Sequence, residues 1–426
     1  MRPDQKKRGA IVTACVVALF SFSIRSYSQS TEPSKWTVTG YHKGLFTLNS
    51  FNDQFVPAGI PGLPALPPTQ SAEYLYHNRI NAKYWGDGWT FHLGMRNRIF
   101  SGYTVANFDA LAADGVPPYA NYASFLDYTH TSGVLPLNIR WFQNDLAAAL
   151  TVFDRFYFDI DRAKWHLRVG RQRVNWGINQ QFNPNDLFNP YNLFDFDYEE
   201  RPGVDAIRYE RYTGPLSSWE VVVAPDTSWA RTNAAARFKS NFKGYDFQAL
   251  AGKYRRYTAV GLGWYGNLGK AGFGGEATFF ARTEYLPDLT SNQTNFVFVT
   301  SVDHAFTEGP FVSVGYLYNR LGEPQPGFLS LFGQQVGQTS PYNPMPFRHT
   351  LTAASIFTLN ELTSAGLTFL STPKAEVFIA VPTLSYSLSQ DWDVSLFMQL
   401  FLTTNPFEDQ YQWMTNALFV RLKQSF

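Results

Sequence analysis

Apolar and polar residues alternate along much of this chain with a period of two. Over residues 89–99, the odd positions are mostly large and apolar, while the even positions carry threonine, histidine, glycine and two arginines. The same division recurs in residues 165–170 and 392–400. A helix would mix the two sets, because its side chains repeat every 3.6 residues. Alternation over about ten residues predicts strands with lipid on one face and water on the other, as in a transmembrane β-barrel.

Eighteen runs of this kind occur, and their connections provide an independent test. The runs cover residues 36–49, 72–85, 89–99, 149–160, 164–175, 203–213, 218–224, 234–242, 245–252, 258–266, 272–282, 295–305, 311–320, 348–358, 362–370, 377–388, 392–402 and 412–426. All the long connections, residues 50–71, 100–148, 176–202 and 321–347, fall at odd places, and the even connections are tight. Barrels of this class alternate short turns with long external loops. The sequence therefore predicts an all-β antiparallel barrel of about 18 strands, with 16 as the alternative.

Two residues do not fit uninterrupted strands. Asp154 falls on the lipid side if its strand has no bulge, and a carboxylate is disfavoured there. Pro382 lies inside a strand whose ladder needs the N–H that proline lacks. We expect a β-bulge or a shifted strand boundary at each.

The first residues have the features of a secretory signal. A basic start precedes an apolar stretch too short to span a bilayer, and Ser26 and Ser28 are small residues at a cleavage position. We therefore predict a signal peptide over residues 1–28 and an outer-membrane β-barrel over residues 29–426. The alternative is a lipoprotein signal in which Cys15 would be acylated.

The last strand ends in an aromatic residue. Phe426 shares a face with Leu422, Val420 and Leu418, although Gln424 on the same face is polar. This ending resembles the C-terminal signature of bacterial outer-membrane proteins. The resemblance implies that Phe426 is an assembly signal, and that outer-membrane lipids and the barrel-assembly machinery are partners.

Composition excludes several other classes of protein. The chain has 426 residues, of which 17% are aromatic and 16% charged, and it holds 35 Lys and Arg against 34 Asp and Glu. The aromatic content excludes a disordered chain, and the near-neutral balance gives no electrostatic footprint for nucleic acid. The mean hydropathy of −0.23 is too polar for a bundle of transmembrane helices. A β-barrel is left as the fold that fits both pattern and composition.

One segment carries a family resemblance. Gly170-Arg171-Gln172 is followed by Trp176-Gly177, and then by the motifs of residues 183–186, 189–190 and 200–205. This arrangement resembles a group of Gram-negative, porin-like outer-membrane barrels with a GRQ...WG core, similar to the alginate-export barrels. The resemblance covers roughly residues 165–210, and it implies eighteen strands and transport.

Chemical motifs support no catalytic function. The sequence has no nucleotide-binding loop, no HExxH and no cysteine pair, so we expect no cofactor and no metal centre. An outer-membrane hydrolase with an active site at one rim is an alternative, but no serine, histidine and aspartate group is evident. The acidic cluster of Asp195, Asp197, Glu199 and Glu200 is read as pairing with nearby arginines rather than as a Ca²⁺ site.

The polar parity of the strands predicts which charges face the lumen. The inward basic residues are Arg79, Lys83, Arg96, Arg98, Arg155, Arg168, Arg208, Arg237, Lys239, Arg421 and Lys423. The inward acidic residues are Asp159, Glu210, Glu220, Asp246, Glu276, Asp303 and Asp393. The lumen then carries 11 − 7 = +4 charges. Basic residues along a channel favour anions, whereas pairing across the lumen would only stiffen the wall; both readings stay open.

The segment 176–202 is too apolar for a free external loop, and we expect it to fold inward. Its predicted constriction residues, with those that flank it, are Arg171, Arg173, Asn183, Asp186, Asp195, Asp197, Glu199 and Arg201. The alternative is a cap over the external mouth. The sequence thus predicts a channel for small hydrophilic solutes, anionic or sugar-like, with a plugged, surface-binding barrel as another alternative.

Overall fold

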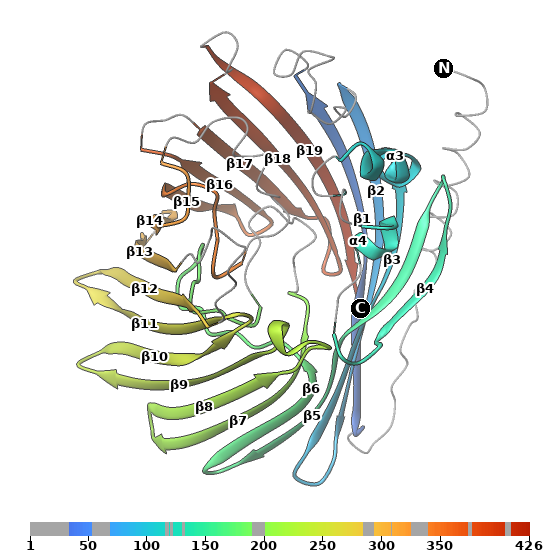
Figure 1. The fold of residues 1–426 in the computed structure, drawn as a ribbon. Helices are drawn as coiled ribbons and strands as arrows, with labels where there is room; N and C mark the ends of the chain where they lie inside the picture. Colours follow the sequence, from blue (N-terminus) through green and yellow to red (C-terminus); the bar gives the residue numbers. More distant parts are fainter. Residues whose placement is uncertain are drawn as a thin grey trace.

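The computed structural model is a closed antiparallel β-barrel (Figure 1). It describes residues 34–52, 69–115, 119, 122–129, 133–189, 201–283, 294–307, 309–324, 340–373, 377–404 and 410–426. The first five strands are β1 (Trp36–Phe51), β2 (Gln70–Trp85), β3 (Thr90–Gly102), β4 (Asn138–Gln143) and β5 (Ala148–Arg162). Then follow β6 (Trp165–Gln172), β7 (Val204–Gly214), β8 (Ser217–Ala224), β9 (Asn233–Phe242), β10 (Tyr245–Tyr254), β11 (Tyr257–Leu268) and β12 (Ala271–Arg282). The last are β13 (Asn295–Ala305), β14 (Phe311–Asn319), β15 (His349–Asn360), β16 (Thr363–Ser371), β17 (Val377–Ser387), β18 (Trp392–Thr404) and β19 (Tyr411–Ser425).

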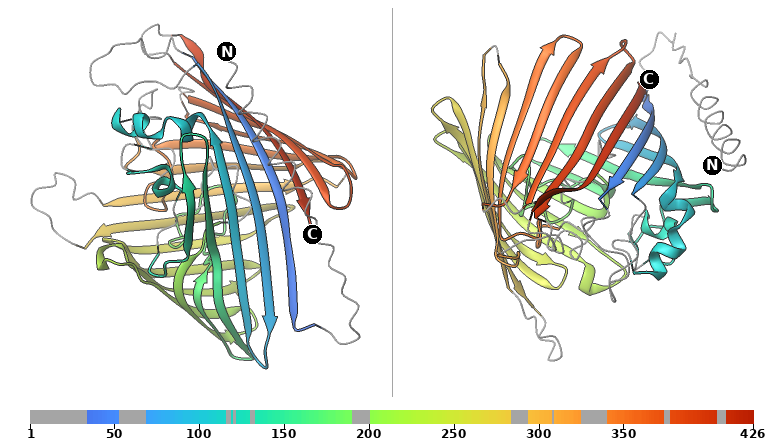
Figure 2. Two further views of the ribbon diagram at one scale, coloured as in Figure 1. Left: turned by 90° about the vertical axis from the view of Figure 1, so that its right-hand side faces the viewer. Right: turned by 90° about the horizontal axis from the view of Figure 1, so that it is seen from above.

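Pairing of the first and last strands closes the wall. Strands β1 and β19 pair from Tyr41↔Ser425 to Phe51↔Thr415, and the blue and red ends of the ribbon lie side by side (Figure 2). The backbone of Phe426 extends this pairing, since its N–H and C=O both bond to Gly40. Among the described residues, β4 pairs with β5 alone, so 19 − 1 = 18 strands form the closed wall. The predicted eighteen strands are confirmed.

Alternation within the strands places apolar side chains outside. Val38, Leu262 and Ile207 are more than half exposed, while Arg208 and Glu210, on the other face of β7, bind charged side chains of the inner wall. An exposed apolar band of this kind is what a lipid-facing barrel wall requires. None of the helices among the described residues is long and apolar enough to span a membrane.

Several tight turns between neighbouring strands are closed by residues with positive φ. Gly86 and Trp89 close the turn between β2 and β3, where Gly88 adopts φ +74°. Lys243 and Gly244, with φ 52° and 81°, join β9 to β10. Positive φ at both central residues matches the right-handed twist of the flanking strands.

The connection between β3 and β5 carries short helices at one end of the barrel (Figure 1). These are α2 (Tyr103–Ala106), α3 (Phe108–Ala113) and α4 (Phe125–Tyr128). A separate 3₁₀ turn, η3 (Trp229–Arg231), precedes β9. The ring of Phe108 lies edge-on to that of Phe125, 5.8 Å away, so the helices share a small aromatic core.

The two irregular positions behave differently. In the β3–β5 ladder, Gly94 pairs with Arg155 and Met95 with Phe153, so Asp154 is the extra residue of a β-bulge and the predicted bulge is confirmed. At Pro382 the register does not shift, since the pairs Ala380↔Leu400 and Thr383↔Phe397 are in phase. The expected irregularity there is wrong: the proline simply interrupts the ladder. Strand β6 also ends at Gln172, three residues before the predicted boundary.

Candidate functional site

The segment that follows β6 leaves the wall and crosses the inner face of the barrel. We call residues 173–189 the inner loop. The indole Nε1 of Trp176 donates to Glu220 of β8 at 3.0 Å, and Gln248 of β10 donates to the carbonyl of Trp176 at 2.9 Å. Further along, Ser301 of β13 donates to Asn179 Oδ1 at 2.8 Å. The inner loop therefore lies across β8 to β13 on the lumen side.

Apolar burial adds to these hydrogen bonds. Trp176 is fully buried, and its ring lies edge-on to Phe188 at 5.0 Å. Leu187 and Phe182 are also buried, in the same cluster as Leu250 and Phe280 of the wall. This cluster explains why the segment is so rich in apolar residues. Residues 190–200, and with them Asp195, Asp197, Glu199 and Glu200, lie outside the described residues, as does the predicted signal peptide.

Asparagine and glycine let the inner loop approach the wall closely. Asn185 is fully buried; its Nδ2 donates to the carbonyl of Leu262 at 3.0 Å, and its Oδ1 accepts from Thr278 at 2.7 Å. A Cβ on Gly261 would lie only 2.3 Å from Asn185 Oδ1, so a side chain there would displace the loop. Glycine inside a strand often marks such a close approach. Gly261 and Thr278 are contacts that the sequence analysis missed, and glycine on the inner face of β11 was the available signal.

Asp186 ties the inner loop to the returning chain. Its Oδ2 accepts from Arg201 at 2.8 Å, and its Oδ1 accepts from the backbone N–H of Trp176 at 3.4 Å. Burial raises the pKa of Asp186 to about 7, although Arg201 and the backbone N–H groups act in the opposite direction. Asn189 adds a second tie, since its side chain accepts from Val174 N–H and donates to the carbonyl of Pro202.

The GRQ motif forms a joint in the wall, that is, a set of hydrogen bonds between β6 and β7. Arg171, which the sequence predicts at the constriction, lies instead in β6 and is fully buried. Its Nε and Nη2 donate to Asp205 of β7 at 2.7 and 2.9 Å. It also donates to the carbonyl of Leu135 at 2.8 Å. Gln172 donates to the carbonyl of Ala206, and Gly170 adopts φ +121°, which L side chains rarely adopt. Arg173 is exposed, just beyond the end of β6.

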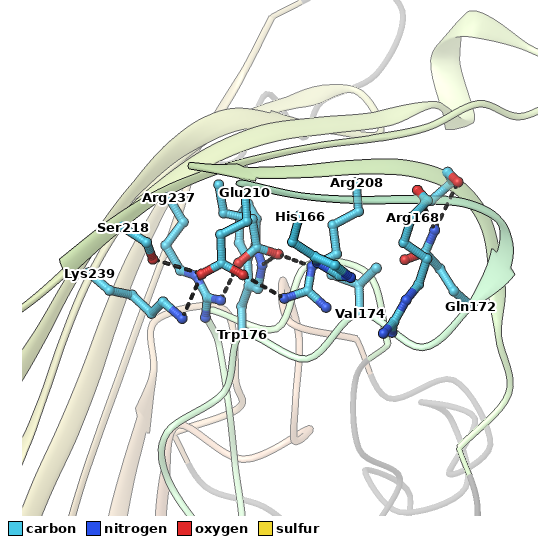
Figure 3. A network of polar contacts seen from close by, with 12 residues as sticks. His166, Arg168, Gln172, Val174, Trp176, Arg208, Glu210, Ser218, Arg237 and Lys239 are labelled. Atoms are coloured by element: carbon cyan, nitrogen blue, oxygen red, sulfur yellow. Dashed lines mark hydrogen bonds and ion pairs between the residues drawn. The ribbon is translucent and has the colours of Figure 1, made fainter. Parts of the chain in front are cut away.

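On the wall that the inner loop crosses, two glutamates are cross-strand neighbours within a network of cations. Figure 3 labels Glu210, Arg208, Arg237 and Lys239 of this network. Glu210 of β7 is directly opposite Glu220 of β8, an arrangement that like charges disfavour. Arg208 binds Glu220 at 2.7 Å and Glu210 at 3.4 Å, Lys239 binds Glu210 at 3.1 Å, and Arg237 also pairs with Glu220. The network contains three cations and two carboxylates, so it is held together by alternating charge and keeps a surplus of +1.

A second cluster surrounds the bulge in β5. Asp154 is fully buried, and its Oδ2 lies 2.8 Å from Arg79, 3.5 Å from Arg96 and 3.5 Å from Arg155. Arg155 also donates to the carbonyl of Arg201, which links this cluster to the chain that returns from the inner loop. Three guanidinium groups share one carboxylate, so this part of the wall is strongly positive.

The remaining predicted lumen cations have other contacts. Arg168 pairs with Asp159 at 2.8 Å, while His166 contacts the other oxygen of the same carboxylate. Lys83 Nζ lies 4.8 Å from the ring of Trp85, and Arg98 donates to the carbonyl of Thr129. Many of these cations are therefore paired along the wall, and the cations outnumber the carboxylates in two clusters.

Two recesses open on the inner face. One, of about 390 Å³, lies between the inner loop and the wall, and its lining includes Ile178, Glu210, Tyr212, Arg237, Lys239 and Gln248. The other, of about 280 Å³, is lined by residues that include Ser364, Ser385, Asp393, Ser395, Arg421 and Lys423. Among the described residues, no three His, Cys, Asp or Glu side chains form a group that could hold a metal ion.

No known family model and no curated protein sequence matches this chain. Its fold is similar to that of OccAB3 from Acinetobacter baumannii, with a TM-score of 0.55, 11% identity, and coverage of 92% of this chain and 99% of that one. It is also similar to OccK5 (OpdH) from Pseudomonas aeruginosa, with a TM-score of 0.55, 6% identity, and coverage of 92% and 98%. The P. aeruginosa OpdK structure with vanillate gives a TM-score of 0.52, 7% identity, and coverage of 91% and 98%. At such low identity, the likeness shows a shared fold.

Proposed function

We propose that this protein is an outer-membrane channel through which small hydrophilic solutes pass passively. The carrying observation is the inner loop, which crosses the lumen side of β8 to β13 inside a closed wall of eighteen strands. A barrel of this size is wide enough to hold water, so a loop fixed inside it narrows the path. A channel needs such a narrowing to select among solutes.

The wall charges favour anionic solutes. Asp154 shares its charge among Arg79, Arg96 and Arg155, and the network around Glu210 and Glu220 has one cation in excess. Basic residues along a pore attract anions. OpdK, which shares the fold, has been solved with vanillate, a carboxylate. We therefore propose that anions, including sugar-like acids, pass in preference to cations.

The proposal includes a location and an origin. We place the protein in the outer membrane of a Gram-negative bacterium, with membrane lipids and the barrel-assembly machinery as partners and with residues 1–28 removed as a signal peptide. The resemblance of the GRQ...WG segment to porin-like barrels related to alginate export supports a transport function. The sequence has no evident group of serine, histidine and aspartate that would support hydrolysis.

Planar-bilayer recording tests the channel directly. The purified barrel should insert in discrete conductance steps, and a salt gradient should give a reversal potential on the anion-selective side. Replacing Arg96, Arg98 and Arg168 together with glutamine removes three positive charges from the wall and should shift the reversal potential toward cations. A barrel that is folded but does not conduct would support the plugged, surface-binding alternative instead.

Shortening the inner loop tests the constriction. We expect replacement of residues 179–189 by a short Gly-Ser linker to raise single-channel conductance and weaken ion preference. Unchanged conductance in a folded barrel would show that the inner loop does not set the narrowest point.

A further inference from the structure

A single carboxylate on the wall accepts hydrogen bonds from both arms of the inner loop, which are residues 178–179 and residue 185. Glu276, near the middle of β12, is fully buried. Its Oε1 accepts hydrogen bonds from the backbone N–H groups of Ile178 and Asn179, the latter at 3.2 Å. Its Oε2 accepts from the backbone N–H of Asn185 at 3.0 Å. Residues 178–185 thus leave and return to the same side chain.

We propose that Glu276 is the positioning residue that latches the inner loop across the lumen, so that the width of the channel depends on this one side chain. The inference rests on the proposed function, in which the inner loop sets the constriction. The parity of β12 predicted a pore-lining role for Glu276. In the structure it lies beneath the inner loop, so it acts on solutes through the loop and not by contact.

The chemistry of the latch favours a carboxylate. Two oxygens in a fixed plane can serve two arms of the chain at once. Because the three donors are backbone N–H groups, the latch fixes the path of the loop and leaves its side chains available for other contacts.

Other hydrogen bonds between the inner loop and the wall each hold only one end of residues 178–185. Asn185 bonds to Leu262 and Thr278 near one arm, and Asn179 bonds to Ser301 near the other. Glu276 alone of these wall residues is bonded to both, among the residues that the structure describes. Its loss should therefore release residues 178–185 together, while Trp176 and Leu187 remain buried against the wall.

Glu276→Gln is the matched test, because it keeps the shape and removes one acceptor oxygen. The amide NH₂ must then face an N–H group of the loop. We expect single-channel conductance to rise by at least half of the increase produced by shortening the loop, with added current noise. Asp303→Asn is the control: it removes a carboxylate from the inner face of neighbouring β13, where Asp303 accepts from the Tyr265 hydroxyl.

Cross-linking separates loop release from a change in charge. Asn179→Cys and Ser301→Cys place thiols on a pair whose polar atoms now lie 2.8 Å apart, and a dibromobimane bridge would tie the loop back to β13. In the Glu276→Gln background, the bridge should restore the low conductance. A conductance that stays high after confirmed bridging would overturn the latch, since the change would then not come from loop movement.

The outcomes distinguish the latch from the proposed function. Wild-type conductance in Glu276→Gln, together with a wide channel after loop shortening, would refute the latch and leave the constriction in place. No change in either variant would refute the constriction itself. If Glu276→Gln does not fold, as judged by heat-modifiable gel mobility, Ile178→Pro decides: it removes one donor and keeps the carboxylate. Wild-type conductance in a folded Ile178→Pro barrel would count against the latch.

Discussion

Replacing Asp154 with asparagine should strongly destabilise the barrel. The carboxylate is fully buried at the bulge of β5 and faces Arg79, Arg96 and Arg155. The side chains of Arg79 and Arg96 are 1% and 8% exposed, so water cannot replace the lost charge. The substitution keeps one acceptor oxygen and nearly the same volume, which limits the perturbation to the negative charge.

The geometry sets the size of the effect. At an effective dielectric constant of about 20, unit charges at the 2.8 Å separation of Arg79 and Asp154 attract by roughly 6 kcal/mol. Desolvation of the groups offsets part of this, and removing one partner of a buried pair costs about 3–5 kcal/mol. Because asparagine still accepts a hydrogen bond, we expect the free energy of unfolding to fall by about 3 kcal/mol, or about two orders of magnitude in the unfolding equilibrium.

Urea unfolding in lipid vesicles, followed by tryptophan fluorescence and by gel mobility, measures this loss. Asp127→Asn is the control, since Asp127 also binds an arginine, Arg140, at 2.7 Å, but the two side chains are 33% and 45% exposed. An exposed pair contributes only about 0–1 kcal/mol. Equal effects of the two substitutions, or a loss under about 1 kcal/mol for Asp154→Asn, would refute the argument from burial.

Three further predictions concern assembly, pH and loop docking. Deleting Phe426, whose backbone bonds to Gly40 and whose ring lies 5.4 Å from His42, should lower the amount of barrel in the outer membrane; normal levels would contradict its role as an assembly signal. Because the folded state raises the pKa of Asp186 to about 7, above its unfolded value, the fold favours the protonated acid. Anchorage of the inner loop should then weaken as pH rises from about 4 through 7, so current noise should grow over this range, and Asp186→Asn should reduce the dependence. Gly261→Ala places a Cβ 2.3 Å from Asn185 Oδ1 and should raise conductance, whereas Gly366→Ala, which meets the movable Thr383 hydroxyl, should not.

Asp154 and Pro382 show which strand irregularities the alternation of polar and apolar residues can predict. The sequence placed a charge on the lipid side of its strand, and that conflict correctly predicted the bulge. The same reasoning was wrong at Pro382, where the chain keeps its register and interrupts the ladder to β18. A charge in lipid is costly enough to force a bulge, whereas one missing N–H is a smaller penalty that the strand can accept.

In the candidate site, too, the local pattern predicted the path of a segment but not the contacts of single residues. The inward folding of residues 176–202 was expected from their apolar content, and the structure places residues 176–189 on the inner wall. The roles of individual residues were not expected: Arg171 belongs to a wall joint with Asp205, and Glu276 lies under the loop. Ile178 and Glu276 are 98 residues apart in the chain, so no local pattern could pair them.

The pattern of side chains along the chain predicted the barrel, about eighteen strands with sixteen as the alternative, and the two faces of each strand. These features depend on neighbours two residues apart, because lipid and water impose opposite preferences on successive side chains. The tertiary structure decided which wall residues meet the inner loop, since those contacts exist only after the sheet closes and brings β8 to β13 opposite the end of β6. Closure fixes the distances between residues that are remote in sequence, and those distances determine which charges are paired, which are buried and what holds the loop in the lumen.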